Sequence, residues 1–239
     1  MNELDKKILI DKYGSIEAIQ DKLDKHYPIQ YLIGDVDFYG YKIKVDERAL
    51  IPRFETEGLI ELVLNTINKY NLNITNILDI GTGTGCIDVV LSKKLNNTNI
   101  STIDISSDAL SLAKENYSLN NVINVEIINN NIFKFTPNKK YDLIISNPPY
   151  VDYEEEVDEE TKYEPQNAIF ADNHGLVFYE HIIKESINWT NDKSIIAFEI
   201  GYNQGEYLKE YASSYYPNAF IEVYKDLSQR DRYLLIINK

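Results

Sequence analysis

The chain has 239 residues, of which 44% are hydrophobic and 26% are charged, so it can bury the core of one globular domain with a small appendage. Its formal net charge of −14 argues against direct, sequence-independent binding of nucleic acids, which requires a basic surface. The single cysteine, Cys86, excludes an internal disulfide, and no apolar run approaches the length that spans a membrane. We therefore expect a cytoplasmic protein with no membrane partner.

The first 50 residues indicate an appendage and a linker. Residues 2–27 place apolar side chains at helical spacing and predict a short N-terminal helical segment. The linker, residues 28–50, contains "DFYGYKIKVD", whose alternation around a glycine predicts a β-hairpin. Residues 51–239 form the expected main domain, which begins with a helix for which Thr56 is the expected N-cap.

Strand and helix patterns alternate after residue 75. Segments with the apolar, β-branched composition of strands lie at 76–80, 100–105, 125–130, 141–146, 194–200, 219–226 and 232–238. Helical patterns lie at 85–95, 107–120, 176–190 and 203–215, and the last two strands leave no room for a helix between them. This order predicts an α/β fold with a doubly wound, mostly parallel seven-stranded sheet whose last strand is antiparallel.

A glycine-rich turn follows the first of these strands. "LDIGTGTGC" places Gly81, Gly83 and Gly85 between that strand and a helix, at the sheet edge where such folds bind nucleotides. Asp104 ends the next strand, where an acid can accept hydrogen bonds from both ribose hydroxyls. The turn and the acid together predict a site for an adenosyl cofactor, with a purely structural turn as the alternative.

The fourth strand ends in "SNPPY", residues 146–150. Two prolines cannot continue a sheet ladder, so the simplest interpretation is a strand terminator. In a doubly wound sheet the first and fourth strands are neighbours, so this loop and the glycine turn open onto one crevice. That placement favours a functional role for the loop.

The two loops carry a resemblance to known enzymes. The spacing G-x-G-x-G resembles motif I of the class I S-adenosylmethionine-dependent methyltransferases, and "NPPY" resembles the motif of those that methylate planar amino groups. Such nitrogens are poor nucleophiles because their lone pair is delocalised. The resemblance implies that the side-chain oxygen of Asn147 and the carbonyl of Pro148 accept the two N–H groups, while Tyr150 packs against the flat acceptor.

Further segments narrow the resemblance to one family. They are "PIQYLIG" (28–34), "DFYGYKIKVDERALIPRFETE" (37–57), "YEPQNAIFADNHGL" (163–176), "FEIGYNQGE" (198–206) and "KDLSQRDRYL" (225–234). With the two loops, they resemble the protein-(glutamine) methyltransferases of peptide chain release factors, the HemK/PrmC type. The resemblance implies transfer of a methyl group from S-adenosylmethionine, leaving S-adenosylhomocysteine, to the glutamine amide of the Gly-Gly-Gln motif of a release factor.

The resemblance also implies roles for individual residues. Those expected to bind the cofactor are Asp79, Gly81, Thr82, Gly83, Gly85, Asp104, Ile105, Asn131, Ile132 and Asn147. Those expected to bind the substrate are Asn147, Pro148, Pro149, Tyr150, Glu164 and Pro165, and the catalytic residues among them are Asn147, Pro148 and Tyr150. The 3 histidines have no ligand-like spacing, so we expect no metal.

The sequence departs from the family pattern in three places. Phe54 stands where the family has proline, and Asn131 stands where it has an acid close to the adenine, which implies weaker binding of the cofactor. The segment before "PIQYLIG" is far shorter than the family's N-terminal domain, which contacts the release factor.

Three alternative functions remain open. They are a ribosomal-protein glutamine methyltransferase, a nucleic-acid amino methyltransferase acting on adenine or guanine, and a non-catalytic S-adenosylmethionine-binding module. The net charge of −14 disfavours the second, and the intact "NPPY" disfavours the third. The run "DYEEEVDEE", residues 152–160, is either a solvated loop or an acidic lip for a basic partner.

Overall fold

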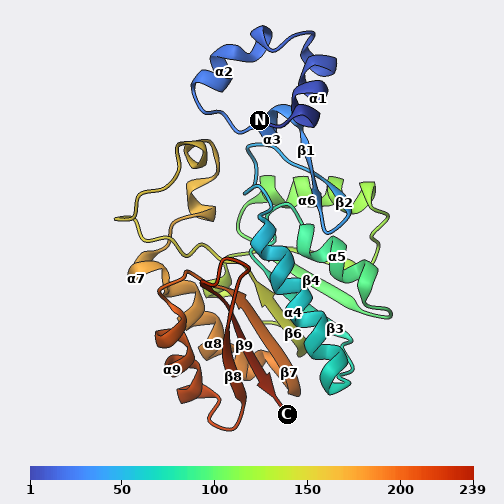
Figure 1. The fold of residues 1–239 in the computed structure, drawn as a ribbon. Coiled ribbons are helices and arrows are strands. Elements are labelled where there is room, and N and C mark those ends of the chain that lie inside the picture. The colour runs from blue at the N-terminus through green and yellow to red at the C-terminus, as the bar shows by residue number, and fades with distance from the viewer.

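The computed structural model describes residues 1–239 and is built around one seven-stranded sheet (Figure 1). The strands are β3 (Asn76–Ile80), β4 (Asn99–Asp104), β5 (Val125–Asn129), β6 (Tyr141–Ser146), β7 (Thr190–Glu199), β8 (Phe220–Lys225) and β9 (Asp231–Asn238). They lie in the order β5-β4-β3-β6-β7-β9-β8. Six strands run in one direction and β9 runs antiparallel to both of its neighbours, β7 and β8, which confirms the predicted fold.

The central pair of strands positions the two loops singled out in the sequence. β3 and β6 are parallel neighbours, with Ile80 opposite Ser146 at their carboxyl ends. The hydroxyl of Ser146 donates a hydrogen bond of 2.6 Å to the carbonyl of Ile80. The glycine turn and the "NPPY" loop therefore leave the sheet side by side, as expected for this topology.

Helices cover both faces of the sheet (Figure 1). On one face lie α4 (Phe54–Tyr70), α5 (Cys86–Lys94) and α6 (Ser107–Leu119), which share a large apolar core with the sheet. On the other face lie α8 (Val177–Trp189) and α9 (Gly205–Tyr215), which bury a second core. The short helix α7 (Asp172–Gly175) precedes α8. None of these helices is long and apolar enough to cross a membrane.

The N-terminal part forms a small unit at one end of the molecule (Figure 1). It contains α1 (Glu3–Tyr13), α2 (Gln20–Asp24), α3 (Ile29–Ile33) and the hairpin of β1 (Asp35–Phe38) with β2 (Tyr41–Lys44). Leu9, Ile19 and Leu32 make its own small core. The hairpin confirms the sequence prediction, whereas α3 was missed because its five residues are too few to show a helical period.

The N-terminal end of α4 corrects one prediction. Arg53 occupies the N-cap position and its side chain makes no capping bond, so the expectation that Thr56 caps this helix is wrong. Thr56 lies inside the first turn and is only 3% exposed. Its hydroxyl instead donates a hydrogen bond of 2.7 Å to the carboxylate of Glu199, at the end of β7.

Candidate active site

The glycine turn between β3 and α5 depends on backbone conformations that favour glycine. Gly81, Gly83 and Gly85 have φ values of 78°, 53° and 77°. A Cβ atom at Gly85 would also lie 2.7 Å from the ring of Tyr117, so α5 and α6 pack closely behind the turn. The turn is tied to β4, because the N–H of Gly81 donates to the carbonyl of Ile103 at 2.9 Å.

Asp104 at the end of β4 faces this turn. Its carboxylate accepts hydrogen bonds from the backbone N–H groups of Gly83 at 3.0 Å and Ser106 at 2.8 Å. Burial nevertheless raises the pKa of the Asp104 carboxyl above its ordinary value. A half-buried carboxylate held by two amides is a fixed acceptor, and it has lone pairs left for a polyol.

A cavity of about 250 Å³, which we name the glycine-loop pocket, opens beside Asp104. Its walls come from the glycine turn, the ends of β4 and β5, the "NPPY" loop and the linker at Leu50. Ile105 and Phe133 line it although 60% and 41% of their surfaces are exposed. Exposed apolar side chains around a polar anchor are typical of a small-molecule site.

The structure separates the expected cofactor residues into two groups. Those that line the glycine-loop pocket are Gly81, Gly83, Asp104, Ile105, Asn131, Ile132 and Asn147. Asp79, Thr82 and Gly85 are buried and do not line the pocket. Asn131 also caps a short 3₁₀ helix, Ile132–Lys134. Its side chain accepts a hydrogen bond from the N–H of Phe133 at 2.9 Å.

A buried pair of carboxyl groups lies beneath the turn. Asp79 and Asp88 are both fully buried, and the hydroxyl of Thr82 lies 2.9 Å from one and 3.4 Å from the other. Tyr117 donates a hydrogen bond to Asp88. Each acid keeps one oxygen, Oδ1, without a partner. Desolvation, followed by the charge of Asp88, raises the pKa of Asp79 well above its ordinary value, and burial also raises the pKa of Asp88.

Asn147 of the "NPPY" loop lies between the glycine turn and α4. The side-chain nitrogen of Asn147 donates to the hydroxyl of Thr56 at 3.1 Å. A Cβ atom at Gly81 would lie 3.8 Å from the carbonyl oxygen of Asn147, so the two backbones are in van der Waals proximity. Asn147 therefore stands at the boundary of the glycine-loop pocket, held by a helix that starts 93 positions earlier in the chain.

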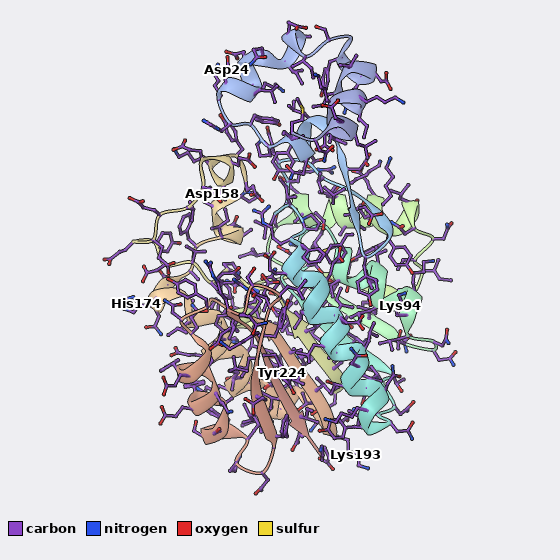
Figure 2. The ribbon with its side chains drawn as sticks, in the orientation of Figure 1. Asp24, Lys94, Asp158, His174, Lys193 and Tyr224 are labelled. Atoms are coloured by element: carbon purple, nitrogen blue, oxygen red, sulfur yellow. The ribbon has the colours of Figure 1, made fainter.

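A larger hollow of about 830 Å³, which we name the acidic cleft, lies on the other side of Asn147. Its acidic wall is the loop of residues 156–161, where Figure 2 marks Asp158 below the N-terminal helices. The residues that line both hollows are Leu50, Asn147, Pro148 and Ala168. Pro149 and Pro165 line only the glycine-loop pocket, whereas Tyr150 and Glu164 line only the acidic cleft.

Tyr150 belongs to a hydrogen-bond chain that sequence reasoning missed. Its hydroxyl donates to Glu199 at 3.3 Å and accepts from Arg232 at 3.4 Å. Glu199 also accepts from Thr56, so it joins α4, β7 and the "NPPY" loop. The sequence does indicate that Glu199 has a partner. It is an acid inside the apolar strand pattern "IIAFEI", and a charge at a buried position needs a partner.

Glu164 has partners within the chain. Its carboxylate accepts from the backbone N–H of Ile51 at 2.9 Å and pairs with Arg53 at 2.5 Å. The side chain of Glu164 is 1% exposed. Its contacts with Ile51 and Arg53 fix the segment after the linker at the wall of the acidic cleft. Glu164 therefore shapes the cleft through the linker.

Comparison with known proteins places the chain in a family. Residues 59–165 match the family model described as "Methyltransferase small domain". The chain is 36% identical to the release factor glutamine methyltransferase of Lactococcus lactis over 99% of its own length and 87% of the relative's. It is 40% identical to that of Streptococcus pneumoniae over 92% and 78% of the two lengths. The chain belongs to the release factor glutamine methyltransferase family.

A solved structure supports the fold of this release factor glutamine methyltransferase family member. The ribosomal protein L11 methylase of Lactobacillus delbrueckii superposes with a TM-score of 0.59 at 19% identity, over 82% of this chain and 85% of that one. The shared fold is the class I methyltransferase sheet. The specific chemistry must come from the residues around the junction of the two hollows.

Proposed function

We propose that this protein transfers a methyl group from S-adenosylmethionine to the side-chain amide of the glutamine in the Gly-Gly-Gln motif of a peptide chain release factor. The observation that carries the proposal is the position of Asn147 and Pro148, which line both the glycine-loop pocket and the acidic cleft. A methyl donor held in the first hollow and an acceptor held in the second meet at these two residues.

The glycine-loop pocket fits the cofactor. Asp104 offers a carboxylate to the ribose hydroxyls, and Ile105 and Phe133 offer exposed apolar surface to the adenine. Asp79, whose buried Oδ1 has no partner, lies beneath the turn and does not line this pocket. When bound, S-adenosylmethionine supplies an electrophilic methyl group on a sulfonium sulfur.

Residues of the "NPPY" loop would hold and orient the acceptor nitrogen of the substrate. Its lone pair is delocalised into the amide, and two acceptors that hold its N–H groups favour a geometry in which the lone pair faces the methyl group. Asn147 offers its side-chain oxygen and Pro148 its carbonyl. The amide nitrogen would form the new N–C bond as the S–C bond breaks and would release one of its two protons to water, with S-adenosylhomocysteine as the other product.

The acidic cleft is proposed to receive the protein substrate. Its carboxylates belong to Glu156, Asp158, Glu159, Glu160, Glu164 and Glu199, and the one arginine that lines it, Arg53, is already paired with Glu164. Such a wall favours a basic protein surface and repels a nucleic-acid backbone. The acceptor glutamine would pass this wall and reach Asn147.

The direct test is incubation of the purified protein with labelled S-adenosylmethionine and separate pools of release factor, ribosomes and DNA. We expect label on the release factor alone, at one glutamine. The matched control is a release factor in which the glutamine of Gly-Gly-Gln is replaced by glutamate, which should remain unlabelled. Label on ribosomes or DNA, with none on the release factor, would replace the proposal by one of the alternative acceptors.

A further inference from the structure

A chain of hydrogen bonds runs from the acceptor side of the site into the sheet. Asn147 Nδ2 donates to Thr56 Oγ1 at 3.1 Å, and Thr56 Oγ1 donates to Glu199 Oε2 at 2.7 Å. Thr56 and Glu199 are 3% and 1% exposed, so bulk water does not compete for these bonds. The members come from α4, the "NPPY" loop and β7, which lie far apart in the sequence.

This series of hydrogen bonds has a fixed donor-to-acceptor direction. A threonine hydroxyl carries one proton, and an ionised carboxylate can only accept. The hydroxyl of Thr56 therefore donates its one hydrogen bond to Glu199, and the oxygen of Thr56 remains available as an acceptor. Of the two ends of the Asn147 amide, only the NH₂ end can satisfy that acceptor. The other end, Oδ1, must then point away from Thr56.

We infer that Thr56 and Glu199 are positioning residues that select which end of the Asn147 amide meets the acceptor nitrogen. The inference rests on the proposed function, because the benefit arises only when the acceptor is a nitrogen with N–H groups to donate. A reversed amide would turn its own N–H groups toward those of the substrate. The two ends of an asparagine amide have nearly the same shape, so packing alone does not choose between them.

Without the hydroxyl of Thr56, the correct orientation of the Asn147 amide loses the hydrogen bond that favours it over the reversed one. A net contribution of about 1.4 kcal/mol is about a tenfold preference for that orientation, so without it the two orientations become about equally populated and the rate falls about twofold. The effect should appear in kcat or in the single-turnover rate, and the affinity for S-adenosylmethionine should be preserved. A merely structural role, in which Thr56 anchors α4 to β7, predicts lower thermal stability with a normal rate per folded molecule.

The decisive variants are Thr56→Val, which keeps the shape and removes the hydroxyl, and Thr56→Ser, which keeps the hydroxyl. We expect Thr56→Val to be about twofold slower at saturating cofactor and Thr56→Ser to stay near the parent rate. Thr66→Val is the matched control, because Thr66 is also buried on α4 but lies ten positions further along the helix. A folded Thr56→Val that methylates at the parent rate would overturn the inference.

If Thr56→Val does not fold, Thr56→Cys decides the question. A thiol fits the same space but is a weak donor and a weak acceptor, so the rate should still fall while cofactor affinity holds. A Thr56→Cys variant at the parent rate would also count against the inference.

A second measurement reads the orientation directly. The side-chain NH₂ signals of Asn147, assigned by their loss in Asn147→Asp, should shift in Thr56→Val and stay in place in Thr66→Val. NH₂ signals that do not respond to Thr56→Val would contradict the inference without reference to activity. If the parent protein does not methylate the release factor, the proposed function fails, whereas the NMR result still decides the orientation of Asn147.

Discussion

The side-chain amide of Asn147 donates to the hydroxyl of Thr56, a residue 91 positions earlier in the chain, at 3.1 Å. The first residue belongs to the loop that ends β6, and the second to the first turn of α4. The segment that follows the hairpin is therefore part of the site and not only a connection to it. This contact brings "IPRFETE" and "SNPPY" together at the candidate site.

The first prediction concerns Asn147 itself. Asn147→Ala removes one of two acceptors for the substrate amide, and removal of one positioned polar group of this kind typically lowers the rate by about 10²–10³. Cofactor affinity should be nearly unchanged, because the ribose and adenine contacts remain. Single-turnover rate, cofactor affinity and melting temperature measured on the same preparation test this.

Asn147→Asp provides the sharper comparison. It keeps an acceptor oxygen but cannot donate to Thr56, so the side chain should sit differently and turnover should fall while the cofactor stays bound. If both Asn147 variants melt earlier yet methylate at the parent rate once folded, Asn147 is a loop-capping residue and the loop is a strand terminator.

The second prediction concerns the cofactor. Asp104→Ala removes the proposed ribose acceptor, and the loss of charge-assisted hydrogen bonds of this kind costs roughly 1.5–3 kcal/mol, or about 10- to 150-fold in affinity. Titration with S-adenosylhomocysteine measures it. Asp108→Ala is the matched control, because Asp108 is an exposed acid in the first turn of α6 that does not line the pocket. Equal affinities for the parent and Asp104→Ala would remove Asp104 from the site.

The sequence predicts the sheet because its strands are apolar and are bounded by glycines, prolines and helical patterns. It also predicts that the glycine turn and "NPPY" converge, since strand order follows from the α/β pattern. It does not predict the partners of Thr56, because a threonine near a helix start is usually a cap, and its contact with Glu199 depends on where β7 ends. Nor does it show that Asp88, in the first turn of α5, shares the hydroxyl of Thr82 with Asp79.

The third prediction concerns the acidic cleft. Asp158→Asn with Glu160→Gln removes two charges from the cleft wall, so the KM for whole release factor should rise and its salt dependence should weaken. The kcat should change little, because neither residue reaches the junction of the two hollows. Glu210→Gln, an exposed position on α9 outside the cleft, is the control. An unchanged KM in the double variant would show that the substrate docks elsewhere.

The fourth prediction concerns the buried acids beneath the glycine turn. Burial raises the pKa of Asp88 to about 6, so the folded state binds its proton more tightly than the unfolded chain does. The stability this provides is present below the ordinary aspartate pKa and is lost as pH rises through about 6. Asp88→Asn removes that loss and still accepts from Tyr117, so its melting temperature relative to the parent should increase from pH 4 to pH 8, by about a few degrees.

Melting curves of the two proteins across that pH range measure the difference, with Asp108→Asn as an exposed control. A difference that stays constant with pH would mean that Asp88 titrates normally or is paired in a way that the geometry does not show.

The last prediction links Glu199 to the pH dependence of the reaction. Burial raises the pKa of Glu199, opposed by its bond with Thr56 and the charge of Arg232, and Glu55 adds a further increase. The hydroxyl of Tyr150 faces the same carboxylate, that of Tyr179 binds the residue's backbone carbonyl, and Tyr233 lies opposite Glu199 on β9. These neighbours leave Glu199 as an acid that gains its proton at a higher pH than an exposed glutamate does.

The sign of the effect follows from the direction of the hydrogen-bond chain. A protonated Glu199 can donate to Thr56, whose own proton then turns toward Asn147 and favours the reversed amide. The single-turnover rate at saturating cofactor should therefore fall as pH drops through the pKa of Glu199, above the ordinary glutamate range. The cofactor must be saturating because the pKa of Asp104 is also raised, and protonation of Asp104 would weaken cofactor binding. In Glu199→Gln nothing titrates at this position, so the acid limb should disappear. An acid limb that persists unchanged in that variant would assign it to another group and separate Glu199 from the reaction.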